Sequence, residues 1–571
     1  MTITSKQPVH YSSARRGTAP ATYAQRHMFA KLSTMEPTTW PQNILQVVPV
    51  PDGLTVVEVR EAVHDLVLRH ESLRTRFRRE ADGMLWQYLS ADGEIGCETW
   101  EVAGEDPDVV GTLAERELEH TNFDLVADAP LRVMVGTLHG APTVAMIVTS
   151  HIATDMLSAR LVRQDLVDLL SARCKGEPAP ELPPRRQPLD QAAFEATIDP
   201  ATTGRSLASW RRRMTTAPPS MFGIRPEPSA PQEFLRAELT STAMSLAADA
   251  LGRRYQLTTT AVVLMAAEAV LLAHYAGADR CALQTAVGNR ISPDLIWSTG
   301  VIRQHSLAVI DVRGASFEQV IRRTWSAWMH AQRHGVFDPG ALDEVRAEVQ
   351  TERGIALSLG AYFNDLRIQT RPRTEEPAAR ILAAADTTRF AWTEEYPADY
   401  MEFQLRLEDV GAATRMSALV DTAAVPRDRV RELLVGMERL LVWQATAGAA
   451  ADGPLTAERL AVITGMSAFE PPPSWVKVNG SWVDLAATRQ LLAQATDGAP
   501  STVRGSDDGR LVGYVSGPFT PEQLHDRCVT TLTGPRFGSR AAHTPHHYVV
   551  CAQGDGDWAD RPVLMEGSGR P

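Results

Sequence analysis

Apolar positions along the first part of the chain follow helix and strand spacings in turn. Residues 57–68 have apolar side chains on one side of a helix, residues 84–89 predict a short strand, and residues 142–148 form the continuous apolar run of a buried strand. Helices and strands that alternate in this way indicate an α/β lobe. We place this first lobe at residues 20–185.

A proline-rich stretch separates this lobe from the next one. Residues 176–191 contain five prolines, and proline continues neither a helix nor a central strand. We therefore expect the chain to cross here into a second lobe over residues 186–448. In that lobe, residues 258–274 predict a buried helix, and residues 427–443 have the apolar spacing of a closing helix.

The two ends of the chain read differently from its middle. The small residues of GAAADGPL, at 448–455, predict a flexible linker over residues 449–470. Residues 471–571 contain further strand-like segments and are expected to form a small α+β domain. Residues 1–19 are polar, lack the apolar core of a signal peptide, and are expected to be disordered.

Composition limits the classes of function. The chain has 571 residues, too many for one core, and its net charge of −12 argues against nucleic-acid binding. Its most apolar stretch, residues 261–273, is interrupted by Glu268 and is too short to span a membrane. We expect a soluble cytoplasmic protein with neither nucleic acid nor membrane as a partner. The cysteines have no CxxC spacing, so no disulfide framework or cysteine-built zinc site is expected: Cys97, Cys174, Cys281, Cys528 and Cys551.

One segment has the features of a reactive site. The apolar strand that ends near Ser150 is followed by His151, and a helix with regularly spaced leucines begins a few residues later. A turn between strand and helix holds a side chain rigidly, and imidazole titrates near neutral pH. Asp155 lies in the first helical turn, where a carboxylate stabilises the helix N-terminus, so we interpret it as structural. Spacing alone leaves open whether His151 is functional or an ordinary polar residue.

Several motifs in the same order give the first 450 residues a family resemblance. They resemble the condensation domains of non-ribosomal peptide synthetases, in the chloramphenicol acetyltransferase-like superfamily. The ordered set extends over roughly the first 300 residues. The matching segments are ATYAQRHMF (21–29), RHESLRTRF (69–77), SHIATDM (150–156), DQAAFE (190–195) with SWRRRM (209–214), VGNR (287–290) and the sequence around Thr299 and Gly300.

The resemblance implies a fold and a set of roles. It implies an α/β (α+β) protein with two chloramphenicol acetyltransferase-like lobes that form a V with a central tunnel, plus the small C-terminal domain. His151 aligns with the catalytic histidine of the family motif, and Asp155 aligns with its aspartate, for which we expect Arg290 as the partner. Arg69, His70 and Arg74, in the RHESLRTRF motif, are expected to be structural.

Three positions depart from the family pattern. Ser150 replaces the first histidine of the family motif, and its hydroxyl is expected to support the site by hydrogen bonding. Met156 replaces a glycine and is expected to narrow the channel. Gln304 replaces the asparagine of the family's Ile-Gly-x-Phe-Val-Asn-Thr segment, with Arg303 and His305 as polar neighbours, so we expect it to shape the acceptor side of the channel.

The last hundred residues resemble the small C-terminal subdomain of adenylate-forming enzymes. Arg561 stands where those enzymes have a catalytic lysine, and the sequence contains no phosphate-binding loop followed by lysine. Adenylation is therefore not expected, and we interpret this part as a remnant or an adaptor. His543, His546 and His547 lack carboxylate or cysteine neighbours in the sequence, so no metal site is expected.

These readings combine into one functional hypothesis. We expect a free-standing condensation enzyme, an acyltransferase of natural-product biosynthesis. It would transfer an acyl group from the phosphopantetheine thioester of an acyl or peptidyl carrier protein to a free or carrier-bound amine, forming an amide. The chain itself is expected to bind no cofactor, and an adenylating enzyme is a further candidate partner. Ester formation with a hydroxyl acceptor, an epimerase, and an inactive module that recruits carrier proteins or enzymes remain alternatives.

Overall fold

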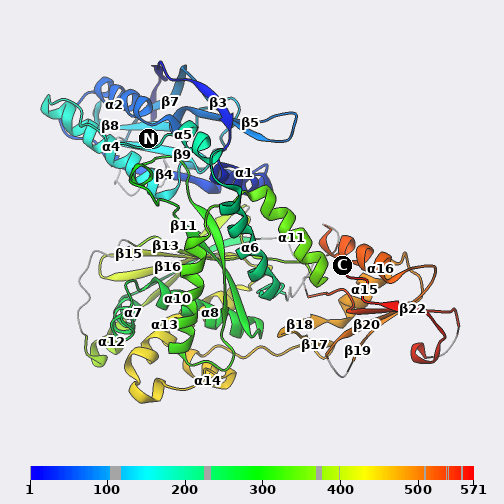
Figure 1. Ribbon diagram of the computed structural model, residues 1–571. Helices are drawn as coiled ribbons and strands as arrows, with labels where there is room; N and C mark the ends of the chain where they lie inside the picture. The colour runs from blue at the N-terminus through cyan, green and yellow to red at the C-terminus, as the bar shows by residue number, and fades with distance from the viewer. Residues whose placement is uncertain are drawn as a thin grey trace. The chain divides into compact units, whose positions relative to one another are not determined.

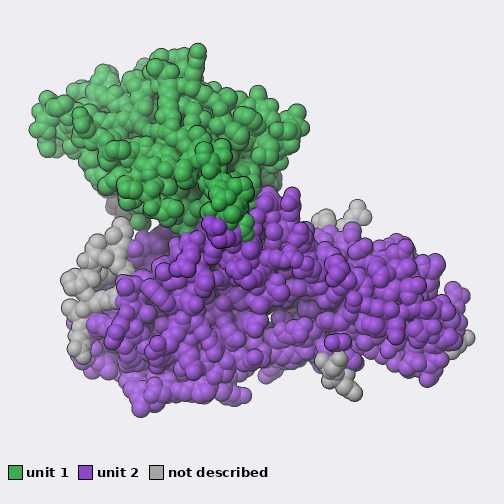
Figure 2. Space-filling model, in the orientation of Figure 1, with its two compact units in different colours: residues 1–204, 287–304, 336–339 green, residues 205–286, 305–335, 340–571 purple. Residues whose placement is uncertain are grey.

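The computed structural model describes residues 2–102, 118–223, 233–367, 376–397, 399–506, 509–534, 537, 539, 541–554 and 557–571. The chain forms two compact units, coloured separately in Figure 2. The first contains residues 1–204, 287–304 and 336–339, and the second contains residues 205–286, 305–335 and 340–571. The first unit extends past the expected boundary at residue 185, to residue 204. It also includes two short segments from later in the chain, residues 287–304 and 336–339.

The first unit is built on a mixed sheet in the strand order β1-β7-β8-β9-β4, with β2 also paired to β7. Helices α2 and α4 pack against each other beside this sheet (Figure 1). Val63 and Leu166 are among the side chains that fill the core there. A smaller sheet has the order β3-β6-β5. The elements are β1 (Thr2–Lys6), β2 (Val9–Ser12), β3 (Gly17–Pro20), α1 (Tyr23–Met35), η1 (Trp40–Gln42), β4 (Asn43–Pro49), α2 (Val56–Arg69), η2 (Glu71–Arg74), β5 (Thr75–Arg79), β6 (Leu85–Leu89), β7 (Asp92–Glu101), β8 (Leu131–Leu138), β9 (Ala141–Ser150), α4 (Met156–Lys175), α5 (Pro188–Glu195) and α9 (Pro293–Ile296).

The N-terminal residues were expected to be disordered, but they form strands β1, β2 and β3. Thr2 lies opposite Glu101 in the pairing of β1 with β7, and Val9 lies opposite Ile95 in the pairing of β2 with the same strand. Val9 and Tyr11 are buried. The partner strand is about 90 residues away in sequence, so a local reading of this polar segment cannot detect the pairing.

The second unit contains a larger sheet in the order β12-β11-β13-β15-β16-β10-β14. Helix α8 is apolar on all sides, and nearly all of its side chains are buried. It packs against α10 and α13. The elements are α6 (Pro200–Thr216), which begins in the first unit, β10 (Phe234–Ser241), α7 (Thr242–Arg254), α8 (Ala261–Ala276), β11 (Arg280–Val287), β12 (Gln304–Asp311), α10 (Phe317–Arg333), α11 (Pro339–Arg353), β13 (Ala361–Asp365), α12 (Ala378–Ala385), β14 (Arg389–Tyr396), β15 (Phe403–Val410), β16 (Ala413–Asp421) and α13 (Arg427–Thr446).

The segment expected to be a flexible linker is structured. It contains η4 (Gly448–Ala451) and α14 (Ala457–Thr464), and α14 packs against α13. Leu460 and Met466 are buried in the core of the second unit. The linker prediction for residues 449–470 is therefore wrong. The prediction rested on the small residues at the start of this segment and did not take account of the apolar face of α14 that follows them.

The last hundred residues have a core of their own within the second unit. A hairpin of β17 and β18 precedes a sheet in the order β19-β20-β21-β22. This domain contacts the end of α11 and the residues that follow it. Ile355 forms an isolated β-bridge with His543, and His525 Nε2 donates to the Thr351 carbonyl at 2.7 Å. The elements are β17 (Trp475–Val478), β18 (Ser481–Asp484), α15 (Leu485–Ala495), β19 (Ser501–Gly505), β20 (Leu511–Ser516), α16 (Pro521–Thr533), β21 (His547–Cys551), η5 (Trp558–Asp560) and β22 (Val563–Gly567).

Two kinds of feature are absent from the described ranges. No helix there combines the length and the apolar character needed to cross a membrane. Nor do three His, Cys, Asp or Glu side chains come together there as the ligands of a metal ion do.

Candidate functional site

His151 lies in the tight turn between β9 and α4, in the first unit. The Ser150 carbonyl accepts hydrogen bonds from the backbone N–H groups of Ala153 and Thr154, at 2.9 and 3.3 Å. The hydroxyls of Thr149 and Thr154 lie 2.6 Å apart and close the turn. Ser150 therefore supports the turn through its carbonyl, and the turn fixes where the histidine side chain leaves the backbone.

The hydrogen bonds of the imidazole determine its tautomer. Nδ1 of His151 lies 2.8 Å from the carbonyl oxygen of Thr154, and Nε2 lies 2.9 Å from Nη2 of Arg303. A carbonyl only accepts and a guanidinium only donates, so Nδ1 carries the hydrogen and Nε2 presents its lone pair. The ring is neutral and in the form that a general base requires, but the guanidinium of Arg303 occupies the basic nitrogen.

The surroundings of His151 strongly favour this neutral form. Burial is the main cause, and the positive charge of Arg303 adds to it, so that the pKa of His151 falls to about 3. The hydrogen bond to Thr154 and the charge of Asp155 act in the opposite direction and are weaker. The imidazole is therefore neutral throughout the neutral pH range, and movement of the Arg303 charge away from Nε2 would make it a stronger base.

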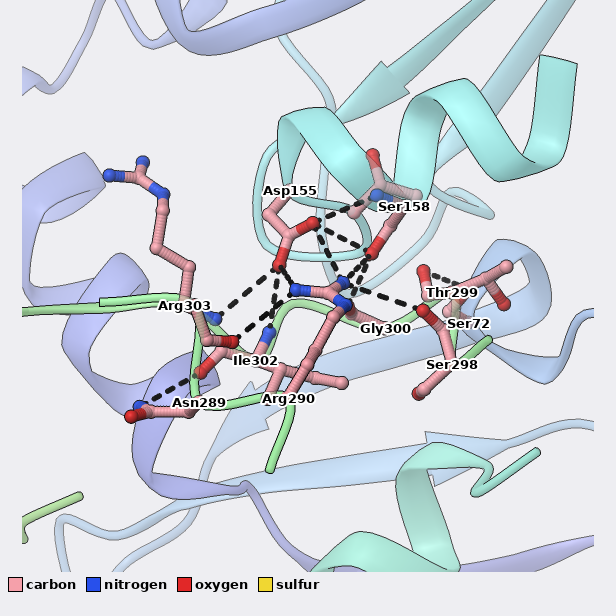
Figure 3. A network of polar contacts seen from close by, with 12 residues as sticks. Ser72, Asp155, Ser158, Asn289, Arg290, Ser298, Thr299, Gly300, Ile302 and Arg303 are labelled. Atoms are coloured by element: carbon pink, nitrogen blue, oxygen red, sulfur yellow. Dashed lines mark hydrogen bonds and ion pairs between the residues drawn. The ribbon is translucent and has the colours of Figure 1, made fainter. Parts of the chain in front are cut away.

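Asp155 caps the N-terminus of α4 and forms the predicted ion pair with Arg290 (Figure 3). The two oxygens of the carboxylate each accept from one terminal nitrogen of Arg290 at 2.9 Å. Oδ1 also accepts from the backbone N–H and the hydroxyl of Ser158, each at 2.9 Å. Asp155 is 2% exposed. Burial alone would raise the pKa of Asp155, but Arg290 and Ser158 outweigh it and lower the pKa to about 2.

The same ion pair attaches residues 287–304 to the turn that carries His151. Oδ2 of Asp155 accepts from the backbone N–H groups of Ile302 and Arg303, at 3.2 and 3.4 Å. The Ser158 hydroxyl oxygen also lies 2.7 Å from the Gly300 carbonyl oxygen, so its single hydrogen is shared between this carbonyl and Asp155 (Figure 3). Asp155 therefore joins α4 to the backbone from which the Arg303 side chain extends.

A second set of polar contacts, centred on His70, also holds the segment of residues 287–304. Nε2 of His70 lies 2.8 Å from Asp165 Oδ2, and its Nδ1 lies 3.0 Å from the Thr299 hydroxyl. Arg69 donates to the other oxygen of Asp165 at 2.6 Å. His70 is fully buried. These contacts agree with the structural interpretation of the RHESLRTRF motif.

Met156 and Gln304, predicted to shape the channel, have different surroundings. Met156 is the first residue of α4, is half-buried, and is not among the residues with a positive φ angle. A side chain in place of the family's glycine therefore causes no backbone strain. Gln304 is buried, and its amide pairs with the backbone of Phe337, donating to the carbonyl at 2.9 Å. Its amide positions the Phe337 segment, and a channel-shaping role for either residue stays a prediction.

Sequence reasoning noticed Arg303 only as polar bulk and missed its contact with His151. The available signal was its place in the motif, because Arg303 stands where the family segment has valine. His27 on α1 was missed as well. Its ring meets Phe337 edge to face, with 5.9 Å between the ring centroids. Burial, followed by the charges of Lys31 and Arg303, holds the pKa of His27 well below its usual value.

Two mixed α/β units and a histidine in a strand-to-helix turn beside an Asp–Arg pair are thus on hand for comparison with known proteins. A family model described as "Condensation domain" matches residues 15–359, more than half of the chain. The chain belongs to the condensation-domain family, whose members are generally acyl-transferring enzymes. The match ends before the C-terminal domain, so the resemblance of that domain to adenylate-forming enzymes stays a prediction.

Curated relatives are non-ribosomal peptide synthetases. Phosphinothricin tripeptide synthetase PhsC of Streptomyces viridochromogenes is 29% identical over 296 residues, which are 49% of this chain and 26% of that protein. CymA of Salinispora arenicola, a probable non-canonical synthetase, is 30% identical over 207 residues, 35% of this chain and 2% of that protein. The match spans about a quarter of the first relative's length and far less of the second's.

Solved structures share the fold. A condensation-domain structure related to chain release from the enacyloxin polyketide synthase has a TM-score of 0.59 and 20% identity, covering 80% of this chain and 86% of that one. SgcC5 from Streptomyces globisporus gives the same TM-score and identity, covering 76% of this chain and all of that one.

Proposed function

We propose that this chain is a free-standing condensation enzyme that forms an amide in natural-product biosynthesis. The donor is an acyl group held as a phosphopantetheine thioester on a separate acyl or peptidyl carrier protein. The acceptor is an amine. His151 is the catalytic residue, and Asp155, Arg290 and Ser150 support it.

The reaction needs one proton acceptor at the attacking nitrogen. The amine attacks the thioester carbonyl carbon, a C–N bond forms, and the C–S bond breaks as the tetrahedral intermediate collapses. Nε2 of His151 takes the proton from the amine and returns it to the departing thiolate, so that the phosphopantetheine leaves as a free thiol. No protein nucleophile is acylated in these reaction steps. The mechanism requires only that donor and acceptor are bound at the same time.

One observation carries the proposal. The imidazole of His151 is held by the Thr154 carbonyl as the Nδ1–H tautomer, which leaves Nε2 as its basic atom. Both nitrogens of the ring have partners within the protein, but the partner of Nε2 is the end of a long, half-buried arginine side chain, which has several alternative rotamers. Family membership adds that a histidine in this turn is expected at the reacting groups.

The test is turnover with a separate carrier. The purified chain is mixed with an acyl-phosphopantetheinyl carrier protein and a panel of amines and alcohols, and loss of acyl carrier and gain of product are followed by mass spectrometry. We expect amide product, and a fall of about 100- to 10,000-fold in kcat/KM for His151→Ala. His10→Ala is the matched control, because His10 is an exposed histidine of the same unit, and it should keep wild-type turnover.

The test also separates the alternatives. Product from alcohols but not from amines would replace the amide by an ester. Turnover that survives His151→Ala would remove His151 from the chemistry.

A second candidate function has a specific observation in its favour. The contact between Arg303 and Nε2 of His151 occupies the lone pair that catalysis needs, which is compatible with a module that binds carriers or enzymes without chemistry. Such a module would bind the acyl carrier with equal affinity in the wild type and in His151→Ala, and neither would give product with any acceptor.

A further inference from the structure

Arg303 extends away from the Asp155–Arg290 pair toward the catalytic histidine. Its backbone N–H donates to Asp155 (Figure 3). Its guanidinium donates to Nε2 of His151. The backbone is therefore fixed by a buried carboxylate, and the half-buried side chain ends on a neutral ring. A guanidinium binds a carboxylate more strongly than it binds a neutral nitrogen, since both partners are then charged and two parallel hydrogen bonds can form.

The surroundings of this guanidinium carry positive charge. Lys31 lies four residues after His27 on α1, so the two side chains share a helix face. The charges that act on His27 are those of Lys31 and Arg303, and both are positive. The negative charge of Asp155 also acts on His151, but it is already matched by two hydrogen bonds from Arg290. This neighbourhood favours an incoming anion.

Catalysis gives such an anion a task. The lone pair of His151 Nε2 must be free before it can take a proton, so the donor hydrogen of Arg303 must be drawn elsewhere. A carboxylate on the substrate is the acceptor best suited to this exchange, because it can bind the guanidinium through two parallel hydrogen bonds. Binding the anion and uncovering the base then happen in one movement of one side chain.

We propose that Arg303, assisted by Lys31, forms a carboxylate-binding subsite that selects a substrate with a free carboxylate near the bond-forming centre. This inference rests on the proposed condensation function and names the substrate class for it. The carboxylate belongs either to a free amino acid acceptor or to the far end of a dicarboxylic acyl donor. Arg303 is a specificity-determining and positioning residue, and His151 remains the catalytic one.

The kinetic experiment uses substrate pairs that differ in the carboxylate. On the acceptor side, glycine, β-alanine and 4-aminobutyrate are each compared with their primary amides. On the donor side, a carrier loaded with a glutaryl group is compared with one loaded with a pentanoyl group. We expect the wild type to favour one set of carboxylates by about 10- to 100-fold in kcat/KM, and the responding arm identifies which substrate carries the anion.

Variants test whether Arg303 causes the preference. Arg303→Met should abolish it, Arg303→Lys should restore part of it, and Lys31→Met should reduce it by a smaller factor. Arg16→Met is the matched control, because Arg16 is exposed in the same unit. Equal use of charged and neutral members by the wild type, or a preference that persists in Arg303→Met, overturns the proposal.

A binding readout separates failure of the subsite from failure of the proposed function. Histidine-labelled protein is titrated with β-alanine, with glutarate and with β-alaninamide, and the NMR signal of His151 is identified from its loss in His151→Ala. The carboxylates should shift this signal in the wild type and not in Arg303→Met, and the amide should not shift it. Turnover without such a shift overturns the subsite alone, whereas a shift without turnover overturns only the proposed condensation activity.

Discussion

Two arginines of one short segment contact the site in opposite ways. The Arg290 side chain is 9% exposed and pairs with a carboxylate that also accepts from Ser158 and from two backbone N–H groups. Arg303 is half-buried, and its guanidinium rests on the neutral ring of His151. The first arrangement is costly to open because a buried charge would lose its partner. The second gives up only a contact with a neutral acceptor, so we assign permanent structure to Arg290 and replaceable contact to Arg303.

The largest effect is expected from breaking the Asp155–Arg290 pair. Arg290→Met leaves a buried carboxylate without its cation, and we expect the free energy of unfolding to fall by about 3–5 kcal/mol. Arg303→Met should change it by less than about 1 kcal/mol, because the ring of His151 keeps its bond to Thr154. Urea denaturation followed by tryptophan fluorescence measures both. Equal losses in the two variants contradict the contrast between the arginines.

A smaller effect concerns the pH dependence of turnover. The pKa of His151 is lowered by burial first and by Arg303 second, so Arg303→Met removes the second cause and raises the pKa. The base is active when neutral, so activity is retained above this pKa and lost as the pH falls through it. We expect the acid limb of kcat/KM for a neutral acceptor to move upward by about one pH unit or more.

A second variant, Lys31→Met, serves as the control for the effect of Arg303 on the pKa of His151. Asp155 and Arg303 act on His151, and Lys31 with Arg303 acts on His27. Lys31→Met should therefore move the limb less than Arg303→Met does. An acid limb that is unchanged in Arg303→Met means that the titration observed does not belong to His151.

The smallest effect is expected at Met156. It has helical backbone geometry at the first position of α4, so Met156→Gly relieves no strain and loses some helix stability, about 0.5–1 kcal/mol. If its side chain limits the channel, the variant should accept bulkier acyl groups while keeping the ratio between carboxylate and amide acceptors. Competition between short and branched acyl carriers measures the first property. A changed carboxylate ratio would join Met156 to the Arg303 subsite.

The elements with strong local patterns were predictable, and those that depend on distant partners were not. Helices α2, α8 and α13 and strand β9 follow from apolar spacing, and the histidine turn follows from its place between β9 and α4. The N-terminal strands escaped because Thr2 pairs with Glu101, far along the chain. Helix α14 was not predicted because its apolar face is short and is buried by packing against α13.

The amino-acid order by itself determined the class of fold, the position of His151 in a turn, and the pairing of Asp155 with an arginine, because local periodicity and ordered motifs encode them. Only the tertiary structure decided which atom of His151 is basic and what covers it. The Thr154 carbonyl sets the tautomer, and Arg303, about 150 residues later in the chain, occupies Nε2. A hydrogen bond depends on the positions of both partners, and here only the folded chain brings them together.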